Sequence, residues 1–215
     1  MLHPRVITAI LAASPARQHG QPRPLLCRDG ETYVSRVAVA AIASRSAEVA
    51  VVTGAHRDEV EAEVMGSGVR CLYNACFREG IASSLRIAAC WAVRQPCDAV
   101  LFLPGDQPHV SGLHVDRLID AFEQHGGRVA SYWGGIPSAP AVFPREDLGE
   151  LLRLRGDEGL RPLLAGDDVW CVPFAGGELE MESVEEPLRE SGVHPIASFA
   201  ELAEELARPM RIRDA

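Results

Sequence analysis

The hydrophobic positions of this 215-residue chain fall into short runs that alternate with stretches of helical spacing. Four runs are the clearest, at residues 5–13, 47–53, 68–73 and 98–103. Their apolar character is continuous rather than alternating, which is typical of strands covered on both faces, as in a parallel sheet. Helical spacing occurs between and after them, at 33–43, 57–65, 81–94 and 111–124. The pattern predicts βαβ crossovers and a doubly wound sheet.

The second half of the chain is less regular. Strands are predicted at 128–133 and 139–143, on either side of a Gly-Gly-Ile-Pro loop at 134–137. We expect short helices at 146–154 and 160–164, a strand at 169–172 and an amphipathic closing helix at 198–207. No internal repeat or linker interrupts the sequence. The prediction is therefore one domain over 1–215, with a Rossmann-like, three-layer α/β/α fold and a mostly parallel mixed sheet.

Composition supports a globular protein of this kind, with 47% hydrophobic and 24% charged residues. The net charge of -9 argues against a broad nucleic-acid-binding face, although it allows a local anion pocket. The first apolar run is too short to span a membrane and lacks the features of a signal peptide. Six cysteines form no CxxC pair, which indicates buried thiols in a reducing compartment. We expect a cytoplasmic protein with no nucleic-acid or membrane partner.

Ligands of open α/β sheets bind beyond the carboxyl ends of the strands, and four segments place unusual residues there. The first follows the 5–13 run and opens into a loop of small and basic residues. Small side chains let backbone N–H groups approach a triphosphate, and arginines neutralise its charge. An ordinary loop with two arginines is the alternative. The candidate nucleotide-binding residues are Leu11, Ala12, Ala13, Ser14, Arg17 and Gly20, and Arg23 is a candidate catalytic residue.

The second segment, 74–85, ends a predicted strand with Asn74 and opens a helix with Gly80 and paired serines. Free N–H groups at a helix start, together with hydroxyl groups, suit a polar ring or a phosphate. Asn74, Gly80 and Ser84 are therefore further candidates for nucleotide binding. The alternative is that Ser83 or Ser84 caps the helix without any ligand.

The third segment is Leu-Pro-Gly-Asp-Gln-Pro at 103–108, directly after an apolar run. Its aspartate, Asp106, is a candidate ligand for Mg²⁺, because this ion favours one or two carboxylates together with phosphate oxygens. A Gly-Asp turn before Pro108 is the alternative. Asp106 is the most specific signal in the chain.

The fourth segment is Gly-Asp-Glu-Gly-Leu-Arg-Pro-Leu-Leu at 156–164. Two interpretations of its arginine stay open. Arg161 either contacts an anionic acceptor or pairs locally with Asp157.

In this order, the segments resemble the molybdopterin nucleotidyltransferase-like family of molybdenum-cofactor cytidylyltransferases and guanylyltransferases. The family patterns are L-A-A/G-G-x-S-x-R-M-G-x-x-K-x-L-L, N-x-x-x-x-x-G-M-x-x-S-L, L-x-D-Q-P and G-D-x-G-A-R-x-L-L. The chain departs from the first of these, since it has Ser14, Ala16, Gln18 and Arg23 where the family has glycine, serine, arginine and lysine. A Gly-His-Pro of the family is replaced by Ser-Ala-Pro at 138–140.

The resemblance implies a fold like that of the nucleotide-diphospho-sugar transferases. It implies Mg²⁺-dependent transfer of CMP from CTP to a phosphorylated acceptor such as molybdopterin, with release of pyrophosphate. Asp106 would hold the metal, and Gln107 and Arg161 would contact the acceptor. Glu182, which stands in the family's D-I-D-T stretch, would be a second metal ligand, although an acidic surface residue is the alternative. A molybdoenzyme is a candidate partner.

Two other functions stay open. The departures at Ser14, Gln18, Arg23 and Ser138 would also suit a catalytically eroded accessory protein that binds a nucleotide or cofactor. The absence of the family's histidine at Ala139 would suit transfer to a different acceptor, such as a sugar phosphate.

Overall fold

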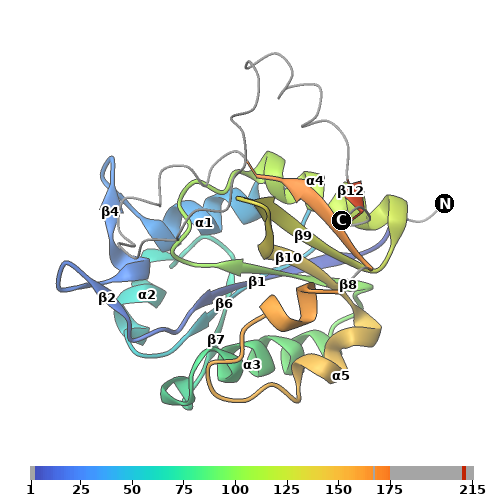
Figure 1. Ribbon diagram of the computed structural model, residues 1–215. Helices are drawn as coiled ribbons and strands as arrows, with labels where there is room; N and C mark the ends of the chain where they lie inside the picture. The colour runs from blue at the N-terminus through green and yellow to red at the C-terminus, as the bar shows by residue number, and fades with distance from the viewer. Residues whose placement is uncertain (1–2, 167, 175–209, 212–215) are drawn as a thin grey trace, which may run out of the picture.

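The computed structural model describes residues 3–166, 168–174 and 210–211, and these residues form one mixed sheet of eight strands with helices on both faces (Figure 1). The strand order is β12-β11-β9-β10-β8-β1-β6-β7. Neighbours are parallel, except that β10 is antiparallel to β8 and β9, and β12 is antiparallel to β11. The strands are β1 (Val6–Ala12), β6 (Val49–Thr53), β7 (Arg70–Tyr73), β8 (Ala99–Pro104), β9 (Arg128–Trp133), β10 (Ile136–Pro144), β11 (Val169–Pro173) and β12 (Met210–Arg211).

Helices α1 (Tyr33–Ile42), α2 (Arg57–Glu63) and α4 (Gly112–His125) cover one face of the sheet, and α3 (Ile81–Val93) and α5 (Leu148–Leu151) cover the other (Figure 1). Residues alternate between the two cores along β1, which explains why its apolar run is continuous. Thr32 and Ser111 cap α1 and α4 by accepting backbone N–H groups of Ser35 and His114. The three-layer α/β/α prediction is confirmed.

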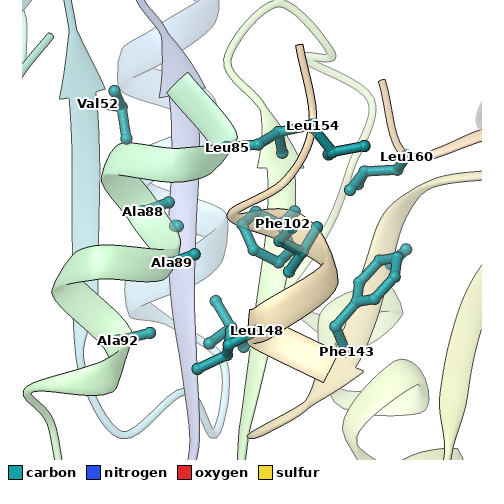
Figure 2. Close-up of a cluster of buried hydrophobic side chains, with 14 of the residues drawn as sticks. Val52, Leu85, Ala88, Ala89, Ala92, Phe102, Phe143, Leu148, Leu154 and Leu160 are labelled. Carbon is teal, nitrogen blue, oxygen red and sulfur yellow. The ribbon is translucent and has the colours of Figure 1, made fainter. Parts of the chain in front are cut away.

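The core under α3 shows how close this helix lies to the sheet (Figure 2). Ala88, Ala89 and Ala92 face the strands, and their small side chains allow the close approach. On the neighbouring strands, the rings of Phe102 and Phe143 meet edge to face with centroids 5.7 Å apart. This layer packs α3 against the sheet, and the second predicted segment leads into this helix.

The loop after β1 contains more structure than its composition predicts. Two hairpins, β2 (Arg17–Gln18) with β3 (Gln21–Pro22) and β4 (Cys27–Arg28) with β5 (Glu31–Thr32), flank the short 3-10 helix η1 (Arg23–Leu25). Both hairpin turns have positive φ at their two central residues, 53° and 81° at His19-Gly20 and 55° and 85° at Asp29-Gly30. Two-residue turns of this type match the twist of the strands that they join.

Three predicted elements differ from the structure. Residues 136–137 belong to β10 rather than to a loop, because Gly134 and Gly135 alone complete the turn and Ile136 already pairs with Trp133. The 146–154 helix is reduced to the 3-10 turn η3 (Arg145–Asp147) and the short α5, in which Gly149 weakens helical propensity. The 160–164 helix is the 3-10 helix η4 (Arg161–Leu164), which is common in such short pieces.

The expectation of buried thiols is wrong for four of the six cysteines. Cys97 and Cys171 are buried, whereas Cys27, Cys71, Cys76 and Cys90 are exposed. Apolar neighbours misled the prediction at Cys71, which lies on β7 at the edge of the sheet. The 198–207 helix lies outside the described residues, and a single domain over 1–215 stays a prediction. Within the described ranges, no helix is long and apolar enough to cross a membrane.

Candidate active site

The carboxyl ends of β1, β7 and β8 lie at one edge of the sheet, and the first three predicted segments extend from them. Gly105, directly after β8, donates its N–H to the Leu11 carbonyl over 2.9 Å. A Cβ at Gly105 would lie only 3.0 Å from Ala12 Cβ, so glycine allows this close approach. The loops after β1 and β8 are therefore held together beside a common space.

Two adjoining cavities occupy this edge. The first, which we call the Gly80 cavity, has a volume of about 390 Å³ and is lined by Leu11, Ala13, Ser14, Pro15, Ala16, Phe77, Arg78, Gly80, Ile81, Ser84 and Asp157. The second, the Asp106 cavity, measures about 300 Å³ and is lined by Leu11, Ser14, Pro24, Ile81, Leu85, Pro104, Asp106, Pro137, Ser138, Ala139, Leu160 and Arg161. Three residues line both: Leu11, Ser14 and Ile81. Mostly apolar walls with a few polar groups are typical of small-molecule sites.

The two cavities differ in which of the predicted residues line them alone. Gly80 and Ser84, predicted to bind a nucleotide, line the first cavity, and so does Ala13. Asp106 and Arg161, predicted to contact metal and acceptor, line the second. Segments more than 50 residues apart in the chain thus meet in two adjacent spaces.

Asp106 forms an ion pair with Arg23, the arginine at the family's lysine position. Arg23 Nε lies 3.0 Å from Asp106 Oδ2, and the two side chains are 46% and 27% exposed. An ion pair this exposed stabilises the fold by about 1 kcal/mol or less. Its importance is therefore chemical, because it places a cation and a carboxylate side by side at the cavity rim.

Asp106 is the carboxylate that lines this cavity and could hold a divalent ion. Mg²⁺ keeps several waters and takes one or two carboxylates together with phosphate oxygens. The described residues hold no cluster of three or more potential metal-ligating side chains. Asp106 would thus supply one ligand and a substrate phosphate others. The second predicted ligand, Glu182, lies outside the described residues.

The hairpin of β4 and β5 extends the basic side of this corner. Arg28 Nη1 lies 3.1 Å from Nε2 of His109, three residues after Asp106. Burial, and then the positive charges of Arg28 and Arg36, lower the pKa of His109. The neutral form of His109 is thereby favoured beside two guanidinium groups.

Asn74 lies behind the wall of the Gly80 cavity, where it holds the cavity residue Ser84 by a hydrogen bond. It is 1% exposed, and its Nδ2 donates to Ser83 Oγ over 2.8 Å and to Ser84 Oγ over 3.1 Å. Its Oδ1 accepts the Cys76 N–H over 2.9 Å. Neither serine caps α3; Ser83 instead donates its hydroxyl to the Gly80 carbonyl over 2.8 Å. All the polar atoms of the Asn74 amide thus have partners within the protein.

Replacing Asn74 with Ala should lower the free energy of unfolding by about 2 kcal/mol, because buried hydrogen-bonding groups lose their partner. Urea titration of Asn74→Ala and the wild type measures the difference. A double-mutant cycle with Ser83→Ala is the control. The double variant should lose less stability than the sum of the losses of the two single variants. Fully additive losses would show that the Asn74–Ser83 contact contributes nothing.

The fourth segment reaches both cavities, with one charged residue in each. Asp157 lines the Gly80 cavity and Arg161 lines the Asp106 cavity. The local pairing left open by the sequence does not occur, since the described contacts include no ion pair between these residues. Arg161 is exposed and available to an anionic acceptor.

Several predicted residues line neither cavity. Arg17 and Gly20 lie in the first hairpin, where Arg17 Nη1 donates to the Gly20 carbonyl over 2.7 Å. Ala12 is buried in β1, and Gln107 Oε1 is buried without a hydrogen-bond partner among the described residues. Asn74 and Arg23 are also absent from both linings, and direct ligand contacts of these six residues stay predictions.

Sequence reasoning did not single out Phe77 or Arg78, and it considered Asp157 only as a partner of Arg161, although all three line the Gly80 cavity. They lie within the motif segments, so their position beside Gly80 and Arg161 was the available signal. Gly54 was not predicted from the sequence either. A Cβ at this position would lie 2.7 Å from Ala13 Cβ and 2.9 Å from Phe77 Cβ. A glycine directly after a predicted strand can indicate such a close approach.

Comparisons with known proteins agree with this architecture. Rv0371c from Mycobacterium tuberculosis H37Rv superposes with a TM-score of 0.69 at 23% sequence identity, covering 80% of this chain and 89% of that chain. Its homologue from Mycobacterium sp. strain JC1 gives 0.69 at 25% identity, covering 80% and 87%. A nucleotidyl transferase from Methanothermobacter thermautotrophicus gives 0.63 at 24% identity, covering 74% and 80%. Rv0371c has also been solved in complex with manganese.

No curated protein matches the sequence. The family model for the MobA-like NTP transferase domain matches residues 8–171, which include β6 to β10, most of β1 and β11, both cavities and all four segments. With this match over most of the chain, the protein belongs to the MobA-like NTP transferase family and is a nucleotidyltransferase.

Proposed function

We propose that this protein transfers a nucleoside monophosphate to a phosphorylated acceptor, with the nucleoside in the Gly80 cavity and the acceptor in the Asp106 cavity. The observation that supports this most is that the cavities adjoin at Leu11, Ser14 and Ile81. Two substrates bound in adjoining cavities have their reacting groups near the boundary. Such placement replaces a bimolecular encounter with a reaction between held groups.

The reaction itself needs no covalent nucleophile from the protein. An acceptor phosphate oxygen attacks the α-phosphorus of the triphosphate, the bond to the bridging oxygen breaks, and pyrophosphate leaves. Mg²⁺ bound through Asp106 would neutralise phosphate charge. Arg23, 3.0 Å from Asp106, is positioned to contact the same phosphates, and Arg161 to hold the acceptor's charge.

The finer identity of the substrates rests on the resemblance of the four segments. By that resemblance, CTP is the proposed donor and molybdopterin the proposed acceptor, with Mg²⁺ as the metal. A molybdoenzyme partner and a cytoplasmic location belong to the same proposal. Transfer to a sugar phosphate is the variant to be tested beside it.

Within this family, a member that still binds a nucleotide but has lost most of its transferase activity is the second candidate, and one observation favours it. The carboxylate expected to hold the metal is already paired with Arg23, which has replaced the family's lysine. Arginine is bulkier than lysine and fixes a fork of donors on a carboxylate. A persistent Arg23–Asp106 pair would compete with the metal.

Pyrophosphate release separates the two candidates. The full-length protein is incubated with Mg²⁺, one labelled triphosphate at a time, and either molybdopterin or a sugar phosphate. We expect acceptor-dependent pyrophosphate release with CTP and molybdopterin. Tight triphosphate binding by calorimetry, without pyrophosphate from any acceptor, would contradict the enzyme and support the binding protein.

A further inference from the structure

The turn that carries Asp157 is built against the start of α3. The Ala82 N–H donates to the Gly156 carbonyl over 3.1 Å. A Cβ at Gly80 would collide with this carbonyl oxygen and with Oδ1 of Asp157. Gly80 also has a φ of 99°, a conformation that other residues rarely adopt. The contact therefore depends on glycine at position 80, and it brings the carboxylate of Asp157 directly beside it.

Hydrogen bonds brace this turn from two sides. Glu158 Oε2 accepts the Arg155 N–H over 2.7 Å, and the Glu158 N–H donates to the Arg155 carbonyl over 3.0 Å. Arg86 on α3 donates to the Leu154 carbonyl over 2.9 Å. Of the two consecutive acidic residues, Glu158 thus holds the turn.

Asp157, by contrast, has no hydrogen bond or ion pair with any residue that the structure describes, and it lines the Gly80 cavity. A carboxylate at neutral pH only accepts hydrogen bonds. It repels phosphate oxygens, which are also acceptors and negatively charged. Asp157 is exposed at the cavity, and the groups of a nucleotide that a carboxylate attracts are its hydrogen-bond donors, which belong to the nucleoside half.

We propose that Asp157 is a specificity-determining residue of the nucleotide site, which accepts a hydrogen bond from a donor group of the nucleoside. The donor is either an exocyclic amino group of the base or a ribose hydroxyl. This inference rests on the proposed function, because it needs the nucleoside in the Gly80 cavity. The braced turn holds the backbone of Asp157 in place beside the cavity.

Calorimetry with the full-length protein and Mg²⁺ tests the inference through pairs of nucleotides that differ by one donor. GTP against inosine triphosphate removes an amino group, CTP against UTP replaces one with a carbonyl oxygen and adds a hydrogen at N3, and each ribonucleotide against its 2′-deoxy and 3′-deoxy forms removes a hydroxyl. The wild type should prefer the donor-bearing member of one pair by about tenfold, as expected for one hydrogen bond to a charged group. Which pair shows the preference identifies the donor.

The Asp157→Ala variant should lose this preference. Glu158→Gln is the matched control, because it removes the adjacent negative charge but keeps an acceptor for the Arg155 N–H; it should keep the preference. If Asp157→Ala changes the affinity for every nucleotide by the same factor, Asp157 acts through charge alone and the inference is overturned. If the wild type binds no triphosphate at all, both the proposed function and this inference are contradicted.

Discussion

Replacing Asp106 with Asn is expected to lower the rate of pyrophosphate release at least about 100-fold while leaving the fold intact. The amide cannot bind a divalent ion as a carboxylate does, and metal charge contributes several kcal/mol to such reactions, with each 1.36 kcal/mol worth a factor of about ten. Loss of the pair with Arg23 should cost about 1 kcal/mol of stability or less. The measurement is the rate of pyrophosphate release across a Mg²⁺ titration, with Mn²⁺ binding followed separately by electron paramagnetic resonance.

Asp98→Asn is a suitable control, because Asp98 precedes the same strand at the opposite edge of the sheet and accepts the Arg5 N–H over 2.7 Å. It removes the same charge without touching either cavity, so its rate should stay within about twofold of the wild type, as distant surface changes usually do. An Asp106→Asn enzyme with wild-type rate and Mn²⁺ affinity would remove Asp106 from the mechanism.

Acid should destabilise the protein through His114, which lies on α4 and is buried against β9. Its Nε2 lies 2.8 Å from Ser131 Oγ, and the Ser131 hydroxyl donates to the Pro140 carbonyl over 2.8 Å. Because the Ser131 hydroxyl hydrogen is donated to Pro140, the hydrogen in the contact with His114 must come from Nε2, which donates to Ser131 Oγ. Burial first, and then the charge of Arg117, lower the pKa of His114 from 6.5 to about 4.

The pH dependence follows from this lowered pKa. The unfolded chain takes up a proton at His114 near pH 6.5, whereas the folded protein resists it until about pH 4. The contribution of neutral His114 to the free energy of unfolding is therefore complete above pH 6.5, decreases as the pH falls from 6.5 to 4, and is lost below pH 4. A shift of this size corresponds to about 3 kcal/mol.

Urea titrations from pH 7.5 to 4 would measure this loss in the wild type and in His114→Gln. Glutamine does not titrate and can still donate to Ser131, so the free energy of unfolding of the wild type relative to the variant should fall by about 3 kcal/mol over the range. A difference between the two proteins that does not change with pH would show that His114 is not the group responsible.

The extent to which the sequence predicted the fold depended on burial. β1 lies between β8 and β6 with helices on both faces, so nearly every side chain of its run is apolar and the strand is visible in the pattern. By contrast, β10 is antiparallel to both neighbours, and its first residues looked like a loop because Gly134 and Gly135 precede them. The two hairpins between β1 and α1 are too short for any periodicity, and only their turns determine them.

For the site, the sequence by itself determined which segments follow the strands and therefore which edge they occupy, since the carboxyl ends of parallel strands meet at one edge. Only the tertiary structure decided which side chains meet there. Asp106 was evident from its motif, but its pairing with Arg23 depends on η1, more than 80 residues earlier. Asp157 lies in the fourth motif, but no sequence pattern showed that it lines the Gly80 cavity, because its position beside Gly80 results from packing between the turn and the start of α3. Such contacts join residues far apart in the chain, and no local pattern of apolar and polar positions contains them.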